Sequence, residues 1–234
     1  MEETRRRTLY GRRRGKKLRA GQQSLLDTLL PRLAVALPEA PQKIDLAQVF
    51  GGTLPAEGIW LEVGFGAGEH LIRQAEQNPQ VGIIGCEPYL NGVAKCLAHI
   101  ERTDVSNIRL FADDARLLMA ALPAQSLARV FVLFPDPWPK TRHHKRRFVQ
   151  RAMLDRLAEL MLPGAELRLA TDDPSYLPWM VEHACLHPDF EWLAERPVDW
   201  RRRPADWPAT RYERKEIAGR PIFLRLRRQK RICS

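Results

Sequence analysis

A short apolar run leads directly into three closely spaced glycines in the stretch Ile59-Trp60-Leu61-Glu62-Val63-Gly64-Phe65-Gly66-Ala67-Gly68. The first five residues are mostly bulky or β-branched and predict a buried strand, and the apolar residues after Gly68 recur at helical spacing as far as Gln77. A strand that turns through glycines into a helix is typical of a doubly wound α/β sheet, in which a nucleotide-like ligand binds at the turn. The stretch therefore predicts an α/β fold with a ligand site at residues 64–68.

Short apolar runs and longer amphipathic runs alternate along the chain beyond this turn. The predicted strands span 81–86, 108–112, 128–134 and 165–170, and the predicted helices span 90–102, 115–122, 148–161 and 175–187. Such alternation predicts a mostly parallel sheet with helices on both faces. Two later strands, near 190–194 and 222–227, have no helical pattern between them, so we expect them to add an antiparallel edge. Leucines from 25 to 33 predict one more helix, packed on the same domain.

Length and composition predict a single domain. With 234 residues, of which 44% are hydrophobic and 28% charged, the chain is able to bury one full core. We predict one domain over residues 21–234 after a basic arm over residues 1–20, for which the sequence leaves order and disorder both open. The longest apolar runs are far shorter than the roughly 18 residues of a membrane span, and no secretory signal pattern follows the basic amino terminus. The four cysteines form no zinc-binding or disulfide pattern, so we expect a soluble protein of the reducing cytoplasm.

The positive charge is concentrated in three segments of the chain. The formal net charge is +10 and the isoelectric point is about 9.9. Nine basic and two acidic side chains fall in residues 1–20, six basic and no acidic ones in 140–151, and thirteen basic and four acidic ones in 196–234. Blocks of like charge repel one another unless a polyanion neutralises them, which favours a nucleic-acid partner. The alternative is that these segments are solvated basic faces.

Acidic residues at the strand ends indicate the kind of ligand. Glu69 occupies the position of the third glycine in a dinucleotide-binding GxGxxG pattern, and a carboxylate there would repel a pyrophosphate, so NAD is disfavoured. Glu87 ends the second strand, where a carboxylate can accept hydrogen bonds from both hydroxyls of a ribose. Asp113 and Asp114 follow the third strand, where either could accept from an adenine amino group or cap the next helix. A glycine-rich turn without a ligand is the remaining alternative.

The fourth strand runs into a stiff loop and then a dense run of cations: Phe134-Pro135-Asp136-Pro137-Trp138-Pro139-Lys140, followed by Thr141-Arg142-His143-His144-Lys145-Arg146-Arg147. Three prolines restrict the loop, which holds an acid and a tryptophan at the carboxyl end of a strand. Cations at a helix N-terminus oppose its dipole, so we expect phosphate contacts from Lys140, Arg142, Lys145, Arg146 and Arg147. A rigid turn ending in a solvated helix start is the alternative. The adjacent histidines have no third ligand nearby, so no metal site is predicted.

Residues 134–147, FPDPWPKTRHHKRR, resemble the signature of the bacterial tRNA (guanine-N7)-methyltransferases, and the resemblance covers nearly the whole chain from residue 61 onward. The glycine spacing after Glu62 resembles the first motif of S-adenosylmethionine-dependent methyltransferases. Leu169-Ala170-Thr171-Asp172 resembles the end of the family's fifth strand, and Thr210-Arg211-Tyr212-Glu213, followed by Lys215 and Gly219, resembles its carboxyl-terminal substrate motif. Pro139 departs from the family pattern, where histidine is frequent, and this bears on the rigidity of the loop and not on its chemistry.

The resemblance implies a fold, an activity and a set of site residues. It implies a Rossmann-like class I methyltransferase with a mostly parallel seven-stranded sheet, which transfers a methyl group from S-adenosyl-L-methionine to N7 of a guanine in tRNA, at position 46 of the variable loop. The cofactor would be bound by Glu62, Gly64, Gly66, Gly68, Glu87, Asp114 and Asp136, and Asp136 would also be the catalytic residue. The tRNA would be bound by Lys140, Asp172, Thr210, Arg211, Tyr212 and Glu213. Asp114 is preferred to Asp113 because Ala115 completes the family's Asp-Ala pair.

Two other functions stay open on the sequence. A methyltransferase that acts on an exocyclic amine would carry an Asp-Pro-Pro-Tyr-like loop at the same strand end, but the order here is Asp136-Pro137-Trp138. A nucleic-acid-binding protein that kept the fold and lost catalysis is the third candidate, and the intact glycines and acids count against it. tRNA is the one expected partner, without a membrane or an obligatory protein partner, and monomer and homodimer remain equally open.

Overall fold

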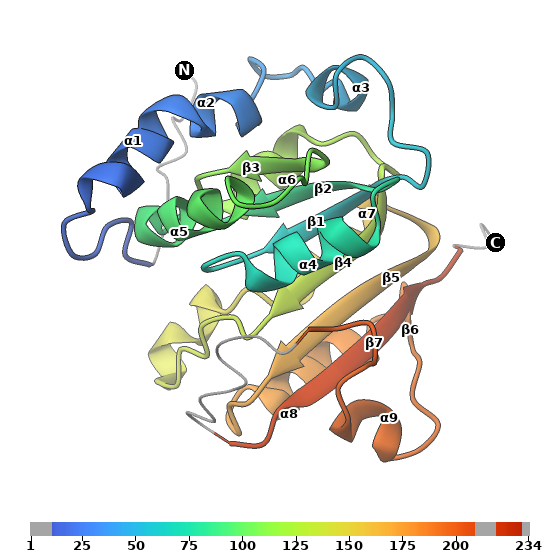
Figure 1. Ribbon diagram of the computed structural model, residues 1–234. Coiled ribbons are helices and arrows are strands. Elements are labelled where there is room, and N and C mark those ends of the chain that lie inside the picture. The colour runs from blue at the N-terminus through green and yellow to red at the C-terminus, as the bar shows by residue number, and fades with distance from the viewer. Residues whose placement is uncertain (1–10, 209–218, 231–234) are drawn as a thin grey trace, which may run out of the picture.

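The computed structural model describes residues 11–208 and 219–230 and contains one seven-stranded sheet with the strand order β3-β2-β1-β4-β5-β7-β6 (Figure 1). The strands are β1 (Ile59–Val63), β2 (Gly82–Cys86), β3 (Ile108–Phe111), β4 (Leu127–Leu133), β5 (Met161–Thr171), β6 (Phe190–Trp192) and β7 (Ile222–Arg228). The first five pair in parallel, and β7 runs antiparallel to both of its neighbours, β5 and β6. The predicted fold class and the predicted antiparallel edge are confirmed.

Helices cover both faces of the sheet, as Figure 1 shows. They are α1 (Ala20–Thr28), α2 (Leu30–Leu33), α3 (Leu46–Val49), α4 (Glu69–Gln77), α5 (Leu90–Ile100), α6 (Ala115–Ala121), α7 (Arg151–Leu160), α8 (Leu177–Met180) and α9 (Val198–Arg201), with a 3₁₀ segment η1 (Thr141–Arg146) and a π-helical turn η2 (Val181–Cys185). Side chains of α4 and α5 pack with Ile83 and Phe131 on one face, while those of α6 and α7 pack with Leu61 and Val130 on the other. Because successive strand residues point to opposite faces, the apolar strands supply both cores.

The position of β1 determines where a ligand can bind. β1 pairs with β2 on one side and with β4 on the other, so the chain reverses its winding direction there. The crevice outside the carboxyl ends of these strands is the usual binding site in an open α/β sheet. The glycine loop after β1 and the acidic loop after β4 both leave the sheet at this crevice.

The predicted helices at 148–161 and 175–187 differ from the structure. The first begins at Arg151 and ends at Leu160, because residues from Met161 onward already belong to β5. The second is a short α-helix and a π-helical turn instead of one α-helix, and Pro178, which lacks a backbone N–H, lies in the first turn of α8. The short helices α3 and α9 carry too few turns to show an apolar period and were not predicted. Within the described part of the chain, no helix is long and apolar enough to cross a membrane.

Candidate active site

A cavity of about 350 Å³ opens at the carboxyl ends of β1, β2 and β4. Its size suits a small organic ligand. Its wall combines glycine backbone, acidic side chains and aromatic rings, among them Gly64, Gly66, Glu87, Asp114, Asp136, Trp138 and Phe148. Three predicted carboxylates, from loops far apart in the sequence, therefore converge on one cavity.

The glycine loop needs glycine for two separate reasons. Gly64, Gly66 and Gly68 all have positive φ angles, of 77°, 58° and 85°, which side chains of L-residues rarely tolerate. A Cβ atom on Gly68 would also overlap the sulfur of Cys96 in α5. The loop thus exposes the backbone of Gly64 and Gly66 to the cavity, while Gly68 lies buried behind it, where it allows α4 and α5 to pack closely.

Glu87 holds the shape of the cavity through both carboxylate oxygens. Its Oε2 accepts a hydrogen bond from the Gly66 N–H at 2.8 Å, and its Oε1 accepts one from the Tyr89 N–H at 2.9 Å. Burial raises the pKa of Glu87, and the nearby Asp136 adds to the rise, although the two N–H groups oppose it. Each carboxylate oxygen can accept a second hydrogen bond, so Glu87 can still accept from a ligand.

Asp113 and Asp114 have different partners. Asp114 lines the cavity and also caps α6, because its Oδ1 accepts from the Arg116 N–H at 3.0 Å. Asp113 forms an ion pair with Arg13 at 3.3 Å and accepts from the Asp114 N–H at 2.8 Å. Asp114 therefore caps α6, as one of the two alternatives predicted, and its carboxylate still lines the cavity.

The loop after β4 is strained and firmly anchored. Phe134 and Trp138 have left-handed φ angles of 50° and 45°, a conformation that costs about 1–2 kcal/mol per non-glycine residue. Arg147 lies only 1% exposed, and its Nε donates to the Pro137 carbonyl oxygen at 2.7 Å. The expectation that Arg147 contacts phosphate is wrong, because its guanidinium is enclosed between the rings of Tyr176 and Trp179.

The other cations of this region lie at the surface next to the cavity. Lys140, Arg142 and Lys145 are exposed, and they belong to or flank the separate 3₁₀ segment η1 instead of starting α7. Arg146 lines the cavity and lies over the Trp138 ring at 4.9 Å. The neighbouring histidines contact different tryptophan rings, Trp138 and Trp179.

The basic segment before α1 runs along α5 towards the cavity, which no sequence pattern predicted. The Leu90 N–H donates to the Arg13 carbonyl at 2.9 Å, and the Gly15 N–H donates to Asn91 Oδ1 at 2.7 Å. Gly11 forms part of the cavity wall. Beside it lies a second, open cavity of about 1120 Å³, whose cations are Arg12, Arg14, Lys16, Lys17, Arg19 and Lys95.

The remaining predicted residues lie away from the cavity wall. Glu62 is 3% exposed, and its carboxylate faces His70 in α4 instead of lining the cavity. Asp172 is partly buried and follows the end of β5. The predicted substrate residues Thr210, Arg211, Tyr212 and Glu213 fall outside the described residues.

The chain matches the profile of a family described as "Putative methyltransferase" over residues 56–223. The tRNA (guanine-N(7)-)-methyltransferase of Paramagnetospirillum magneticum is 51% identical to this chain, and the aligned region covers 95% of this chain and 93% of the relative. The tRNA (guanine-N(7)-)-methyltransferase of Rhodospirillum rubrum is 50% identical, and the aligned region covers 96% of this chain and 89% of the relative.

Among solved structures, the 16S rRNA methyltransferase KamB is similar with a TM-score of 0.52 at 15% identity, covering 84% of this chain and 99% of KamB. An rRNA methylase from Streptococcus thermophilus has a TM-score of 0.51 at 12% identity, covering 82% and 100%. These two show the same fold. The sequence relatives go further, since about half of all residues are identical over nearly the full length of both chains, and the chain therefore belongs to the bacterial tRNA (guanine-N7)-methyltransferase family.

Proposed function

We propose that this protein transfers a methyl group from S-adenosylmethionine to N7 of a guanine in tRNA and so forms 7-methylguanosine. The observation that carries the proposal is the convergence of Glu87, Asp114 and Asp136 on one cavity beside the exposed cations that follow β4. Family membership supplies the substrate class. Position 46 of the variable loop rests on the resemblance of the signature loop and is part of the proposal.

The cavity suits S-adenosylmethionine better than a phosphorylated cofactor. Its carboxylates would repel a pyrophosphate but attract a ligand that carries a sulfonium and an ammonium group. Glu87 retains acceptor capacity for the ribose hydroxyls, and Asp114 for the adenine amino group. When bound, S-adenosylmethionine supplies an electrophilic methyl group.

The residues after β4 carry the chemistry on the tRNA side. Guanine N7 has a free in-plane lone pair, so the protein needs no base to expose it and acts mainly by positioning. Transfer leaves positive charge on the purine, and the carboxylate of Asp136, placed at the N1–H and amino edge, stabilises that charge. Trp138 offers a stacking surface for a base taken out of its stack, and its contacts with Arg146 and His143 give it a second role in fixing the loop.

Cations around the cavity bind the tRNA backbone in this proposal. Lys140 lies in the loop after β4, the partly buried Asp172 follows the end of the neighbouring strand β5, and we assign Thr210 to Glu213 to the same substrate site by the resemblance. Cys86 and Cys96 are buried free thiols, which agrees with the reducing cytoplasm as the place of action.

The proposed activity is tested by methylation of unmodified tRNA with labelled S-adenosylmethionine. Digestion should yield labelled 7-methylguanosine, mapped to position 46. Label on an exocyclic amine would favour the amino-methylase alternative. Tight S-adenosylmethionine binding without transfer to any tRNA would favour a binding protein.

Glu87→Ala is expected to weaken S-adenosylmethionine binding by roughly 1–3 kcal/mol, because ligand hydroxyls lose their acceptor and the Gly66 and Tyr89 N–H groups lose theirs. Titration calorimetry measures the change. Glu101→Ala, which removes an exposed carboxylate just after α5, is the matched control and should bind like wild type. Unchanged affinity of the Glu87 variant would remove this residue from the cofactor site.

The second, open cavity, which carries Arg14, Lys17 and Lys95 among its cations and is called the basic groove from here on, is expected to contribute to the salt dependence of tRNA binding. In Arg14→Gln/Lys17→Gln, the slope of log affinity against log salt should become shallower by roughly 0.7–0.9 for each phosphate that the protein no longer neutralises. Arg32→Gln/Lys43→Gln removes the same two charge types near α2 and α3 and should keep the wild-type slope. Equal slopes in all three proteins would mean that the groove does not meet the tRNA backbone.

A further inference from the structure

Residues 11–17, called the strap from here on, are held against the start of α5 by Asn91. The Oδ1 atom of Asn91 accepts a hydrogen bond from the Gly15 N–H at 2.7 Å, and its Nδ2 donates to the Lys16 carbonyl oxygen at 2.7 Å. Both partners are backbone groups, so this clamp uses none of the strap's side chains. One asparagine thus holds the strap through two hydrogen bonds.

Two further contacts bring the strap close to the same helix. The Leu90 N–H is the first amide of α5, for which the helix has no acceptor of its own, and it donates to the Arg13 carbonyl oxygen at 2.9 Å. Gly15 passes so close to Tyr89 that a Cβ atom would overlap the phenol hydroxyl. A residue with a side chain at this position would therefore push the strap away from α5.

An ion pair connects the strap to the wall of the cofactor cavity. Arg13 lies 3.3 Å from Oδ2 of Asp113, whose Oδ1 accepts from the Asp114 N–H at 2.8 Å. Asp114 and Gly11 both line the cavity, so the strap forms one part of the wall and is linked to another. Because the Arg13 side chain is 43% exposed, this pair contributes little, and Asn91 carries more of the attachment.

The strap is the part of the cavity wall that is least costly to move. The glycine loop and Glu87 directly follow core strands, Asp114 caps α6, and the loop after β4 is anchored by the buried Arg147. The strap, in contrast, is exposed along its whole length and consists of glycines and cations alone. Segments with few buried contacts open first in a folded protein. We therefore expect the cavity to open at the strap before it opens elsewhere.

We propose that Asn91 is a positioning residue for the cofactor: by clamping the strap against α5 it closes one side of the cavity, and S-adenosylmethionine enters and S-adenosylhomocysteine leaves when the strap opens. The inference rests on the proposed function, which supplies the cofactor. A ligand that leaves through a locally opened state dissociates in proportion to the population of that state. The strength of the clamp therefore sets how long the cofactor stays in the cavity.

Asn91→Ala tests the clamp. It removes two hydrogen bonds that hold the strap, and it leaves every residue of the cavity wall in place. We expect S-adenosylmethionine to dissociate about tenfold faster, which is the size of losing one to two net hydrogen bonds. A chase of bound, labelled S-adenosylmethionine with excess unlabelled S-adenosylmethionine, in the full chain without tRNA, measures this rate.

The association rate separates a closing strap from a damaged cavity. A strap that hinders exit hinders entry equally, so association should also be faster in Asn91→Ala, and the Kd should stay within about threefold of wild type. A cavity that had lost its shape through the neighbouring Tyr89 and Glu87 would instead lose affinity through faster dissociation alone. The rate of methyl transfer in a single turnover should not change, because the loop after β4 is intact.

Hydrogen exchange of the Leu90 amide reports opening of the strap directly, because its acceptor is the Arg13 carbonyl oxygen. In Asn91→Ala this amide should exchange faster than in wild type, by about the same factor as the cofactor dissociates faster.

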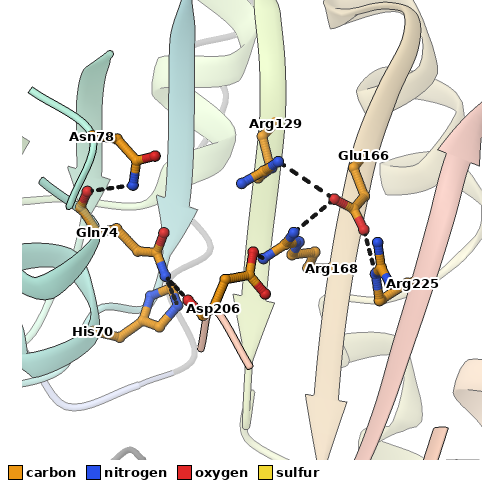
Figure 2. Close-up of polar contacts among 8 residues, drawn as sticks. All are labelled: His70, Gln74, Asn78, Arg129, Glu166, Arg168, Asp206 and Arg225. Carbon is orange, nitrogen blue, oxygen red and sulfur yellow. Dashed lines mark hydrogen bonds and ion pairs between the residues drawn. The ribbon is translucent and has the colours of Figure 1, made fainter. Parts of the chain in front are cut away.

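Asn78→Ala is the matched control. It removes another partly buried asparagine whose Nδ2 donates to a backbone carbonyl oxygen, that of Gln74 at 2.7 Å (Figure 2). Asn78 lies at the end of α4 and lines neither the cavity nor the basic groove, so cofactor dissociation should match wild type.

Arg14→Gln/Lys17→Gln is the control for charge. It removes two cations from the groove side of the strap and keeps the clamp. Cofactor dissociation should stay within about twofold of wild type, which separates attachment of the strap from its electrostatic effect on the cofactor.

Wild-type dissociation in Asn91→Ala would overturn the inference, whether or not the Leu90 amide exchanges faster. Faster dissociation with an unchanged association rate would overturn it as well, since the clamp would then only support the shape of the cavity. A wild-type protein that binds no S-adenosylmethionine would contradict the proposed function itself.

Discussion

Asp136→Ala is expected to lower kcat by at least about a hundredfold while the protein still binds both substrates. The size is that of losing one electrostatic group aimed at charge that develops in the transition state. Steady-state kinetics with saturating S-adenosylmethionine and tRNA measure it. Retained kcat would mean that the carboxylate at the mouth of the cavity does not meet the reacting base.

Lys140→Ala is the control from the same loop. A phosphate contact is made equally before and during transfer, so its loss should raise the KM for tRNA and leave kcat nearly unchanged. Equal losses of kcat in both variants would mean that the loop acts as one positioning unit. Asp136→Asn keeps the shape of the side chain and removes its charge, and wild-type kcat in this variant would favour the amino-methylase alternative.

The pH dependence provides an independent check on Asp136. Desolvation by the surrounding loop raises the pKa of Asp136 above its ordinary value of about 3.9. The ionised form stabilises the purine cation, so kcat should fall as the pH decreases through this raised pKa. In a plot of kcat against pH, the decrease on the acidic side should therefore occur at a higher pH than for an unperturbed aspartate. Asp136→Asn should not show this decrease.

Arg147→Met is expected to lower kcat between about tenfold and a hundredfold, although Arg147 touches no substrate. Methionine fills a similar volume, but the Pro137 carbonyl loses its donor and the strained loop loses its anchor. A hydrogen bond to a charged group contributes about 1.5–3 kcal/mol to stability, so the melting temperature should fall as well.

Arg151→Met is the matched control for Arg147→Met. Arg151 begins α7 four residues later, and its exposed side chain pairs with Asp155 at the surface. Its loss should change neither kcat nor the melting temperature measurably. A destabilised Arg147 variant with wild-type kcat would show that the anchor serves folding and does not position Asp136.

Local sequence patterns were sufficient to predict the fold and the acidic residues of the cavity wall. Each strand is a short apolar run, and the glycines and acids that follow successive strands necessarily meet at one edge of a parallel sheet. The convergence of Glu87, Asp114 and Asp136 therefore follows from their places at strand ends.

Long-range packing determined what the sequence could not predict. Arg147 looks like its exposed neighbours in the cation run and differs only in the two aromatic rings that enclose it, which come from residues about thirty positions later. The position of Glu62 just before the glycine loop predicts a contact with the ligand, but its carboxylate is hydrogen-bonded to His70 instead. Arg168 and Asp206 form an ion pair at 2.7 Å across the face of the sheet (Figure 2). No sequence motif links the two residues, because the pairing depends on the path of the chain after α9.

The place of β7 has a consequence for synthesis of the protein. It is the last strand in the chain, yet it lies between β5 and β6, so β6 has no partner in the sheet until β7 is made. The β5 residues Glu166–Thr171, which pair with β7, have one edge open while the carboxyl-terminal part emerges from the ribosome. The cavity wall, by contrast, is built from residues between Gly11 and Phe148, all of which precede β7 in the chain. A nascent chain therefore holds every residue of the cavity wall before the strand that completes its sheet has been made.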